Sequence, residues 1–380
     1  NGINGYYLSE AAPSPTLSSS WTGITPAATN YSVNIPYTLS AGDGDKTVYA
    51  WFKDVAGNIS PSVSATITLD LSAASPLDVW TWSMPSTSNQ QFNGIAYGNG
   101  LYVAVADNST VATSSDGITW TTKTYGNINA NLKGITYGNG IFVAVGDSNG
   151  KGFVITSADG VTWHGRNSGT TNNLSGVAFG NGKFVAVSSS WWDRVLTSSD
   201  GIQWQETASI GQWANWNGVV YGGNKFVAIG GNGYTITSTD GTNWTYKSAG
   251  TMYLYGIAYG NGKYIAVGNS TILVSTDGST WDNKTPTGLT NSLYGVTWGN
   301  NMFVAVGDSG KLYTSVDGLT WTSKSLGTTN TLRSVLYGNN LFVAMGSNGS
   351  IVTSPDGSTW TNRTDTSPQY INILTYGNGT

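Results

Sequence analysis

The residue in this sequence with the clearest chemical potential is an aspartate that recurs about every 40 residues in the motif Thr-Ser-x-Asp-Gly-x-x-Trp or a close variant. A carboxylate could bind calcium or act as a general acid. Copies spread evenly along a chain cannot meet in one active site, however. We therefore interpret the aspartate as a turn residue that accepts backbone N–H groups, beside a glycine with positive φ and a tryptophan packed between repeats. The seven copies are Asp116, Asp159, Asp200, Asp240, Asp277, Asp317 and Asp356.

Other carboxylates stand in short loops rich in Gly, Ser and Asn. Asp147 and Asp308 each supply one carboxylate, and Asp43 with Asp45 supplies two. Calcium loops need several carboxylates among about six to eight oxygen ligands. We interpret all of these loops as turns, with the Asp43–Asp45 segment as the better metal candidate. His164 is the only histidine, which excludes a multi-histidine metal site and leaves little for a Ser-His-Asp triad. We predict no metal and no cofactor.

The repeat itself predicts the fold. A second phrase, Gly-Ile-x-Tyr-Gly-Asn-Gly-x-Phe-Val-Ala-Val-Gly, precedes each aspartate motif, and each repeat contains four short β-type runs, as at residues 133–137, 141–146, 152–156 and 161–165. The sequence Asn139-Gly140 suits a tight hairpin turn. Four antiparallel strands per repeat, arranged radially, form an all-β protein of the β-propeller class. Here the chain resembles the Asp-box (BNR) propellers, which include sialidases, sortilin-type receptors and photosystem assembly factors.

The resemblance covers residues 79–380 and has one consistent departure. Asp-box motifs usually read Ser-x-Asp-x-Gly-x-Thr-Trp, whereas here the glycine follows the aspartate directly. A further strand is expected at Trp80–Trp82 and another at residues 371–376, in addition to the seven full repeats. We predict seven blades of four strands, with eight as the alternative if the chain continues past Thr380.

A sialidase-type reaction would need three clustered arginines, a tyrosine with a glutamate partner and an acidic group, as the resemblance implies. The repeat region has one glutamate, Glu206, and only Asp193 lies off the repeat in a neighbouring segment. A glycosidase needs two carboxylates that face one bond. We therefore predict no catalytic residues and no enzyme. The four arginines of the region occupy unrelated repeat positions: Arg166, Arg194, Arg333 and Arg363.

The largest departures from the repeat fall on one face of the predicted propeller. The loops after each second strand and the connections between repeats share this face, which we call the variable face. Loops that vary on a rigid scaffold usually carry the binding site, and aromatic rings beside short polar groups suit a sugar or a protein partner. Packing between the third and fourth blades is the simpler alternative. The candidate ligand-binding residues are Trp191, Trp192, Asp193, Arg194, Glu206, Gln212, Trp213, Asn215, Trp216, Tyr253 and Tyr255, with Tyr294 extending the aromatic arc.

Composition restricts the partners. The 380 residues carry a net charge of −4, have no cysteine, and include 9% charged and 12% aromatic residues. An acidic balance argues against nucleic acid or an anionic membrane surface, and no apolar run approaches the roughly 18 residues of a membrane span. The chain begins at Asn1 without a signal peptide, so we expect a processed or excised piece. The polar, weakly charged composition suggests an extracellular or cell-surface location.

Residues 1–72 lack the repeat and form a separate predicted module. Residues 31–37, 46–52 and 63–69 alternate polar and apolar residues, as half-buried strands do. The phrase from Val48 to Ser60 resembles the late strands of bacterial Ig-like modules, which are β-sandwiches. By that resemblance the first one or two strands precede Asn1 or come from another chain. Residues 73–78 are expected to be a linker.

These patterns favour an extracellular recognition or adhesion protein of bacterial or phage-like type, with no catalytic activity. Its partner would be a glycan, bound by the aromatic loop cluster, or a surface protein. The first alternative is a structural subunit of an extracellular fibre, completed by neighbouring copies of the chain because both ends present open β-edges. The second alternative is a glycoside hydrolase of sialidase-like fold.

Overall fold

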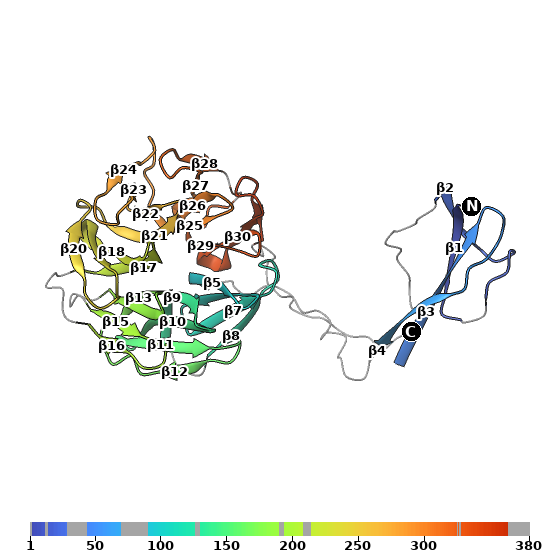
Figure 1. Ribbon diagram of the computed structural model, residues 1–380, viewed down its shortest axis with the longest axis horizontal. Coiled ribbons are helices and arrows are strands. Elements are labelled where there is room, and N and C mark those ends of the chain that lie inside the picture. Colours follow the sequence, from blue (N-terminus) through green and yellow to red (C-terminus); the bar gives the residue numbers. More distant parts are fainter. Residues whose placement is uncertain are drawn as a thin grey trace, which may run out of the picture. The chain divides into compact units, whose positions relative to one another are not determined.

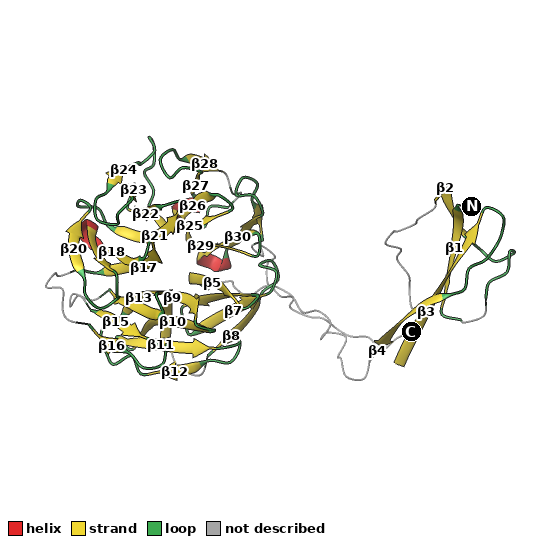
Figure 2. Cartoon of the chain, viewed as in Figure 1, coloured by secondary structure: helices red, strands yellow, loops and turns green. Residues whose placement is uncertain are grey.

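The computed structural model describes residues 2–363 apart from 12–13, 29–43, 70–89, 126–129, 190–193, 208–213, 325 and 327. The chain divides into two compact units, Asn1–Trp82 and Ser83–Thr380. Nearly all of the regular structure is β-strand (Figures 1 and 2). The expected linker at 73–78, the expected strands at Trp80–Trp82 and 371–376, and Asp43 lie outside the described residues.

In the first unit, the described residues form one four-stranded antiparallel sheet with the order β2-β1-β3-β4. Its strands are β1 (Ile3–Ser9), β2 (Thr22–Ala28), β3 (Gly44–Asp54) and β4 (Val63–Leu69). β3 and β4 include the segments predicted at 46–52 and 63–69, whereas 31–37 is not described. Trp51 is buried and lies against Tyr7, with ring centroids 6.1 Å apart. The second sheet of an Ig-like sandwich is not among the residues described in this unit.

The described residues of the second unit form seven four-stranded antiparallel sheets, each made of consecutive strands. β29, the inner strand of the seventh sheet, packs on β5, the inner strand of the first, so the ring closes (Figure 1). The predicted seven-bladed propeller is confirmed. Blades 1 to 7 in order are β5 (Phe92–Gly98), β6 (Leu101–Ala106), β7 (Thr110–Ser114), β8 (Thr121–Thr124); β9 (Ala130–Gly138), β10 (Ile141–Ser148), β11 (Lys151–Ser157), β12 (His164–Arg166); β13 (Leu174–Gly180), β14 (Lys183–Ser188), β15 (Val195–Ser198), β16 (Gln205–Glu206); β17 (Trp216–Gly222), β18 (Lys225–Gly230), β19 (Tyr234–Ser238), β20 (Thr245–Ser248); β21 (Leu254–Gly260), β22 (Lys263–Gly268), β23 (Thr271–Ser275), β24 (Asp282–Asn283); β25 (Leu293–Gly299), β26 (Met302–Gly307), β27 (Leu312–Ser315), β28 (Thr322–Lys324); and β29 (Leu332–Gly338), β30 (Leu341–Gly346), β31 (Ile351–Ser354), β32 (Thr361–Asn362).

Each aspartate motif forms the same hydrogen-bonded turn. In blade 1, Oδ1 of Asp116 accepts the N–H groups of Ile118 at 2.8 Å and Thr119 at 2.7 Å and the hydroxyl of Ser114 at 2.9 Å. Gly117 has φ +74°, and a Cβ at this position would lie 2.9 Å from Leu341 of the preceding blade. The turn therefore requires glycine both for its backbone conformation and for the contact between blades.

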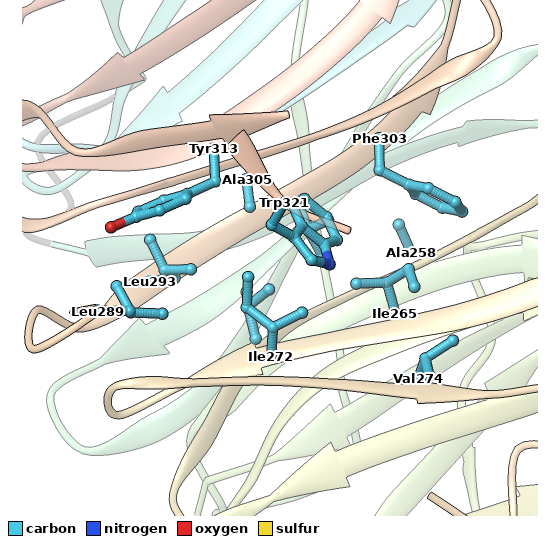
Figure 3. Close-up of a cluster of buried hydrophobic side chains, with 12 residues drawn as sticks. Ala258, Ile265, Ile272, Val274, Leu289, Leu293, Phe303, Ala305, Tyr313 and Trp321 are labelled. Atoms are coloured by element: carbon cyan, nitrogen blue, oxygen red, sulfur yellow. The ribbon is translucent and has the colours of Figure 1, made fainter. Parts of the chain in front are cut away.

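The tryptophan that closes each motif packs between blades. In six blades its Nε1–H donates to the carbonyl of the motif glycine at 3.0–3.3 Å, whereas Nε1 of Trp281 in blade 5 has no partner. Figure 3 shows one such junction, where Trp321 and Phe303 of blade 6 pack on Ile265 and Ile272 of blade 5. Equivalent clusters fill the other junctions. At the ring closure, the hydroxyl of Tyr102 in blade 1 also donates to the carbonyl of Gly338 in blade 7.

The motif aspartates predict an acid-sensitive stability. Burial alone would raise the pKa of Asp277, but hydrogen bonds from the backbones of Thr280 and Ser279 outweigh it and lower the pKa to about 2; the pKa of the other six is also lowered. A carboxyl group whose pKa is lower in the folded state stabilises the fold above its unfolded pKa of about 3.9, and this stabilisation is lost as pH falls through the folded pKa. We expect the thermal midpoint to change little between pH 7 and about 5 and to fall steadily from about pH 4 to about pH 2, as measured by calorimetry.

The variant Asp240→Ala tests the same turn at neutral pH. It removes the acceptor for the N–H groups of Thr242 and Asn243, each bonded at 2.8 Å. We expect a loss of about 1 kcal/mol and a thermal midpoint lower by about 2–4 °C, with a shallower acid slope because one titrating group is gone. A wild-type midpoint that stays constant from pH 5 to pH 2 would contradict this account of the turns.

Candidate functional site

Each inner strand of the propeller carries one extra residue near its N-terminal end. In blade 1, Phe92 lies opposite Ala106 and Gly94 lies opposite Val105, so Asn93 has no opposite residue. The same shift of register occurs in the other six blades. Such β-bulges redirect the side chain of the extra residue. The seven bulge residues, which we call the channel ring, are Asn93, Lys133, Ser175, Asn217, Tyr255, Tyr294 and Arg333.

The inner strands surround a cavity of about 200 Å³. Four members of the channel ring line it, together with the two residues that follow the bulge in every blade. The first of these two residues is glycine in six blades because the strands lie very close: a Cβ on Gly134 would lie 3.0 Å from Cα of Gly176. Blade 7 has Ser334 at this position. The four lining members of the ring are Asn93, Lys133, Tyr294 and Arg333.

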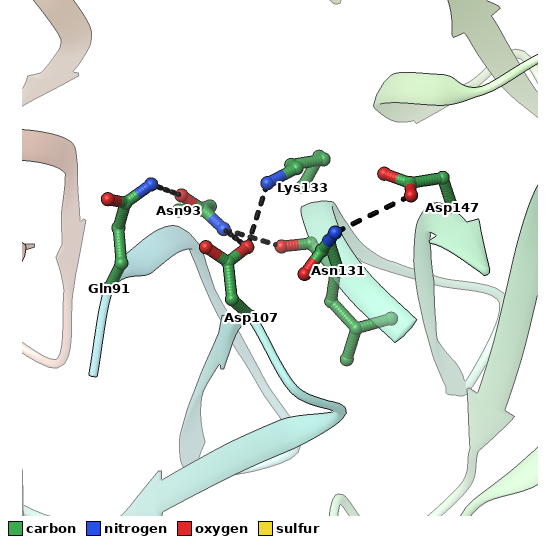
Figure 4. Close-up of polar contacts among 7 residues, drawn as sticks. Gln91, Asn93, Asp107, Asn131, Lys133 and Asp147 are labelled. Atoms are coloured by element: carbon green, nitrogen blue, oxygen red, sulfur yellow. Dashed lines mark hydrogen bonds and ion pairs between the residues drawn. The ribbon is translucent and has the colours of Figure 1, made fainter. Parts of the chain in front are cut away.

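One side of the channel ring is a polar network (Figure 4). Nζ of Lys133 lies 2.7 Å from Oδ1 of Asp107, which also accepts a hydrogen bond of 2.9 Å from Nδ2 of Asn93. The same amide donates to the carbonyl of Leu132 in the next blade at 2.9 Å. These contacts fix Lys133 and Asn93 across the junction between blades 1 and 2.

The other side of the channel ring is aromatic. The rings of Tyr255 and Tyr294 lie 5.1 Å apart, and the guanidinium carbon of Arg333 lies 5.2 Å from the centre of the Tyr294 ring. The hydroxyl of Tyr294 contacts Oδ2 of Asp308 at 3.3 Å. Burial raises the pKa of both tyrosines, and the negative charge of Asp308 adds to this effect. Both phenols are therefore protonated at neutral pH and able to donate hydrogen bonds.

Tyr253 extends the aromatic side toward solvent. Its side chain is 45% exposed, and its ring lies against Gly231 in the 3-10 turn η1 (Gly231–Gly233) of blade 4, where an added Cβ would come within 3.0 Å of it. Its carbonyl accepts the N–H of Asn269 at 2.9 Å. Tyr253 is close enough to Tyr255 to help raise its pKa, and the ring of Tyr255 in turn contacts that of Tyr294, which lines the cavity.

Only part of the predicted aromatic loop cluster lies among the described residues. Arg194 and Glu206 form an ion pair of 3.4 Å beside the third blade. The carbonyl of Asn215 accepts the N–H of Gly231 at 2.9 Å, while its side-chain Oδ1 is buried without a partner. Five of the candidate residues lie outside the described part of the chain: Trp191, Trp192, Asp193, Gln212 and Trp213.

Trp216 requires a correction. The sequence places it in the ligand-binding cluster, but its side chain is completely buried and packs with Val185, Val187 and Phe226 between blades 3 and 4. It is the residue of β17 immediately before the bulge. The other six blades have a buried Phe or Leu at this position. Trp216 cannot offer a ring face to a ligand, and the packing alternative applies to it.

Sequence reasoning missed Asn93, Lys133 and Arg333 as site residues. Arg333 was considered only as one of four arginines at unrelated repeat positions. The structure shows that all three occupy one equivalent position, directly before the Gly-Ile or Gly-Val step of the inner strand, which in blade 7 is Ser334-Val335. The signal was a variable position directly before the repeated phrase in every blade. Among the described residues, no cluster of three or more His, Asp or Glu residues could hold a metal, and no helix is long and apolar enough to cross a membrane.

Comparisons with known proteins support the fold. No family model and no curated protein matches the sequence. Among solved structures, YCF48 bound to D1 peptide is similar with a TM-score of 0.57 and 16% identity, covering 71% of this chain and 93% of that one. YCF48 from Cyanidioschyzon merolae has a TM-score of 0.57 and 15% identity, and the match covers 71% of this chain and 97% of that one. A catalytically inactive virginiamycin B lyase from Staphylococcus aureus with quinupristin has a TM-score of 0.61 and 11% identity, and the match covers 70% of this chain and 96% of that one.

The lyase contradicts the prediction that the chain is not an enzyme. That prediction considered only the groups of a sialidase and found them missing, whereas virginiamycin B lyase shows that a propeller of this shape supports other chemistry. At 11–16% identity these likenesses establish the fold and no activity. The second unit of this chain is a β-propeller of four-stranded antiparallel blades, in common with YCF48 and virginiamycin B lyase.

Proposed function

We propose that this protein is an extracellular or cell-surface recognition protein, of the Asp-box propeller group, that binds carbohydrate on its variable face. The observation that carries the proposal is the group of Tyr253, which is exposed, and the ring pair of Tyr255 and Tyr294 in the channel ring beside it. Sugars present apolar C–H faces that pack on aromatic rings and hydroxyls that hydrogen bond to short polar groups. The weakly charged composition, 9% of all residues, supports an extracellular location.

The two sides of the channel ring supply both kinds of contact. The tyrosines offer ring faces and protonated hydroxyls, while Asn93, Lys133 and Arg333 offer hydrogen-bond donors at the cavity. The loop residues Trp191, Trp192 and Trp213 belong to the same face in the predicted connectivity and remain part of the proposed site. The ligand would therefore lie across the variable face with one end at the cavity.

A glycan array tests the proposal. We expect the wild type to bind a restricted set of glycans and Tyr253→Ala to weaken that binding roughly 3- to 10-fold, since an aromatic contact contributes about 0.5–1.5 kcal/mol beyond burial. Leu319→Ala is the matched control, because Leu319 is also 45% exposed but lies in an aspartate-motif turn on the opposite face. Loss of binding in both variants, or in neither, would count against the site.

A peptide ligand is the second candidate. The specific observation is that YCF48, which shares the fold, has been solved with a bound D1 peptide. Aromatic residues and arginine are also the residues preferred at protein interfaces. A wild-type protein that binds no glycan on the array but captures a cell-surface protein through Tyr253 would favour this candidate.

A further inference from the structure

The charged residues that line the cavity are both positive. Lys133 and Arg333 line it, and its described lining includes no carboxylate. The charge of Lys133 is balanced by Asp107 at 2.7 Å. Arg333 takes part in none of the ion pairs found among the described residues, and its Nε is buried without a hydrogen-bond partner. An arginine that lines a cavity without a carboxylate partner can pair there with an anionic group of a ligand.

Among the described residues, no carboxylate forms an ion pair with Arg333. Asp308 lies beside Tyr294: its Oδ2 contacts the Tyr294 hydroxyl at 3.3 Å and its Oδ1 accepts the hydroxyl of Thr331 at 3.2 Å. Asp308 is not among the lining residues. The Tyr294 ring holds the guanidinium from one side, which reduces the entropy that Arg333 would lose on binding a ligand.

Further donors continue around the ring from Arg333. Its neighbour Ser334 carries a hydroxyl where the other six blades have glycine. β29 packs on β5 and β5 packs on β9, so blades 7, 1 and 2 are consecutive. Arg333, Ser334 and Lys133 therefore lie on one arc of the cavity wall. A guanidinium with a nearby hydroxyl and ammonium group suits an oxyanion, and the planar fork of arginine matches a carboxylate best.

The size of the cavity limits what can enter. Its volume of about 200 Å³ is below the roughly 300–1,000 Å³ of pockets for drug-sized ligands, so it admits one end group. We propose that the cavity receives the acidic end sugar of a glycan chain, with a carboxylate or sulfate against Arg333 and the following sugars on Tyr253 and Tyr255. This inference rests on the proposed carbohydrate function and specifies the ligand class.

Isothermal titration calorimetry with three oligosaccharides of equal length tests the inference: one ending in a hexuronate, its methyl ester, and one ending in a sulfated hexose. The methyl ester keeps the shape of the sugar and removes its charge. We expect the hexuronate or the sulfated sugar to bind at least about tenfold more tightly than the ester, and Arg333→Gln to abolish that difference. Whichever of the two charged oligosaccharides binds more tightly shows whether the cavity recognises a carboxylate or a sulfate.

Arg363→Gln is the matched control. It removes the same charge from the same blade, but Arg363 follows the outer strand β32 and its Nε donates to Thr353 at 3.2 Å. We expect its affinities to equal those of the wild type. Arg333→Lys keeps the charge without the planar fork and should retain part of the preference. Thermal melts of all variants establish that they fold.

Two results would overturn the inference and differ in what they say of the proposed function. Equal binding of hexuronate, ester and sulfated sugar, unchanged in Arg333→Gln, would exclude an acidic end group while leaving carbohydrate recognition intact. Absence of any glycan binding by the wild type would overturn both. In that second case, binding of a peptide with a free C-terminal carboxylate that depends on Arg333 would assign the cavity to a protein ligand.

Discussion

Replacing Trp216 with alanine is expected to lower the free energy of unfolding of the propeller by about 3–5 kcal/mol. The side chain is completely buried at the junction between blades 3 and 4, where it packs with Val185, Val187 and Phe226. Its removal would leave a cavity among side chains that belong to different blades and cannot all move inward. Urea denaturation monitored by circular dichroism measures the change.

Trp216→Phe separates packing from the indole N–H. Nε1 of Trp216 is buried without a hydrogen-bond partner, so phenylalanine removes an unfavourable group while it keeps much of the volume. Five other blades have Leu, and one has Phe, at the position before the bulge. We expect the phenylalanine variant to lose less than half as much stability as the alanine variant. A Trp216→Ala protein with wild-type stability and no ligand binding would restore the original interpretation of Trp216 as a ligand contact.

Gly268→Ala is expected to have the second-largest effect, by moving the aromatic side of the site. A Cβ on Gly268 would overlap the carbonyl oxygen of Tyr253, which lies two residues before the bulge residue Tyr255 of the same blade. Overpacking of this kind costs about 1–3 kcal/mol. Blades 1 and 3 have Ala106 and Ser188 here, and the corresponding hydrogen bonds from Asp107 to Gln91 and from Ser189 to Asn173 are 3.4 Å and 3.0 Å, against 2.9 Å from Asn269 to Tyr253. The bulge therefore accommodates a Cβ by opening to different extents.

The consequence for function follows from the position of Tyr253. If the bulge of blade 5 opens, Tyr253 and Tyr255 shift together relative to Tyr294, because Tyr253 directly precedes β21 and Tyr255 is its bulge residue. We expect a stable fold with weakened glycan binding, measured by denaturation and by titration with the best ligand from the array. Gly262→Ala is the control: with φ +72° and no atom within 4 Å of its added Cβ, it introduces backbone strain alone. Unimpaired binding in a destabilised Gly268→Ala protein would contradict this positioning role.

The repeat predicted the architecture well because its signals are local. The motif Ser-x-Asp-Gly-x-x-Trp closes on itself through bonds from Asp116 to the N–H groups two and three residues on. The turns at Asn139-Gly140 and its equivalents likewise depend on adjacent residues with positive φ. The four strands of each repeat could therefore be predicted directly from the sequence. In the first unit, β1 and β2 were missed, since 22–28 includes a proline and 3–9 lacks clear alternation.

The candidate site was predicted only in part, because its residues become neighbours through the ring and not along the chain. Tyr253 and Tyr255 stood out as aromatic residues in a variable connection. Lys133 and Arg333 did not, since each looked like an isolated charge in its own repeat. Only the closure of β29 on β5 places them around one cavity.

The sequence by itself determined the blade number and the turns, since a repeated period and short-range hydrogen bonds leave few other arrangements. The tertiary structure alone decided which side chains reach the centre. It did so through a one-residue bulge in every inner strand, which assigns Trp216 to the core and the next residue, Asn217, to the channel ring. A bulge reverses the side on which a strand residue points, and its place depends on pairing with the neighbouring strand, which no single repeat reveals.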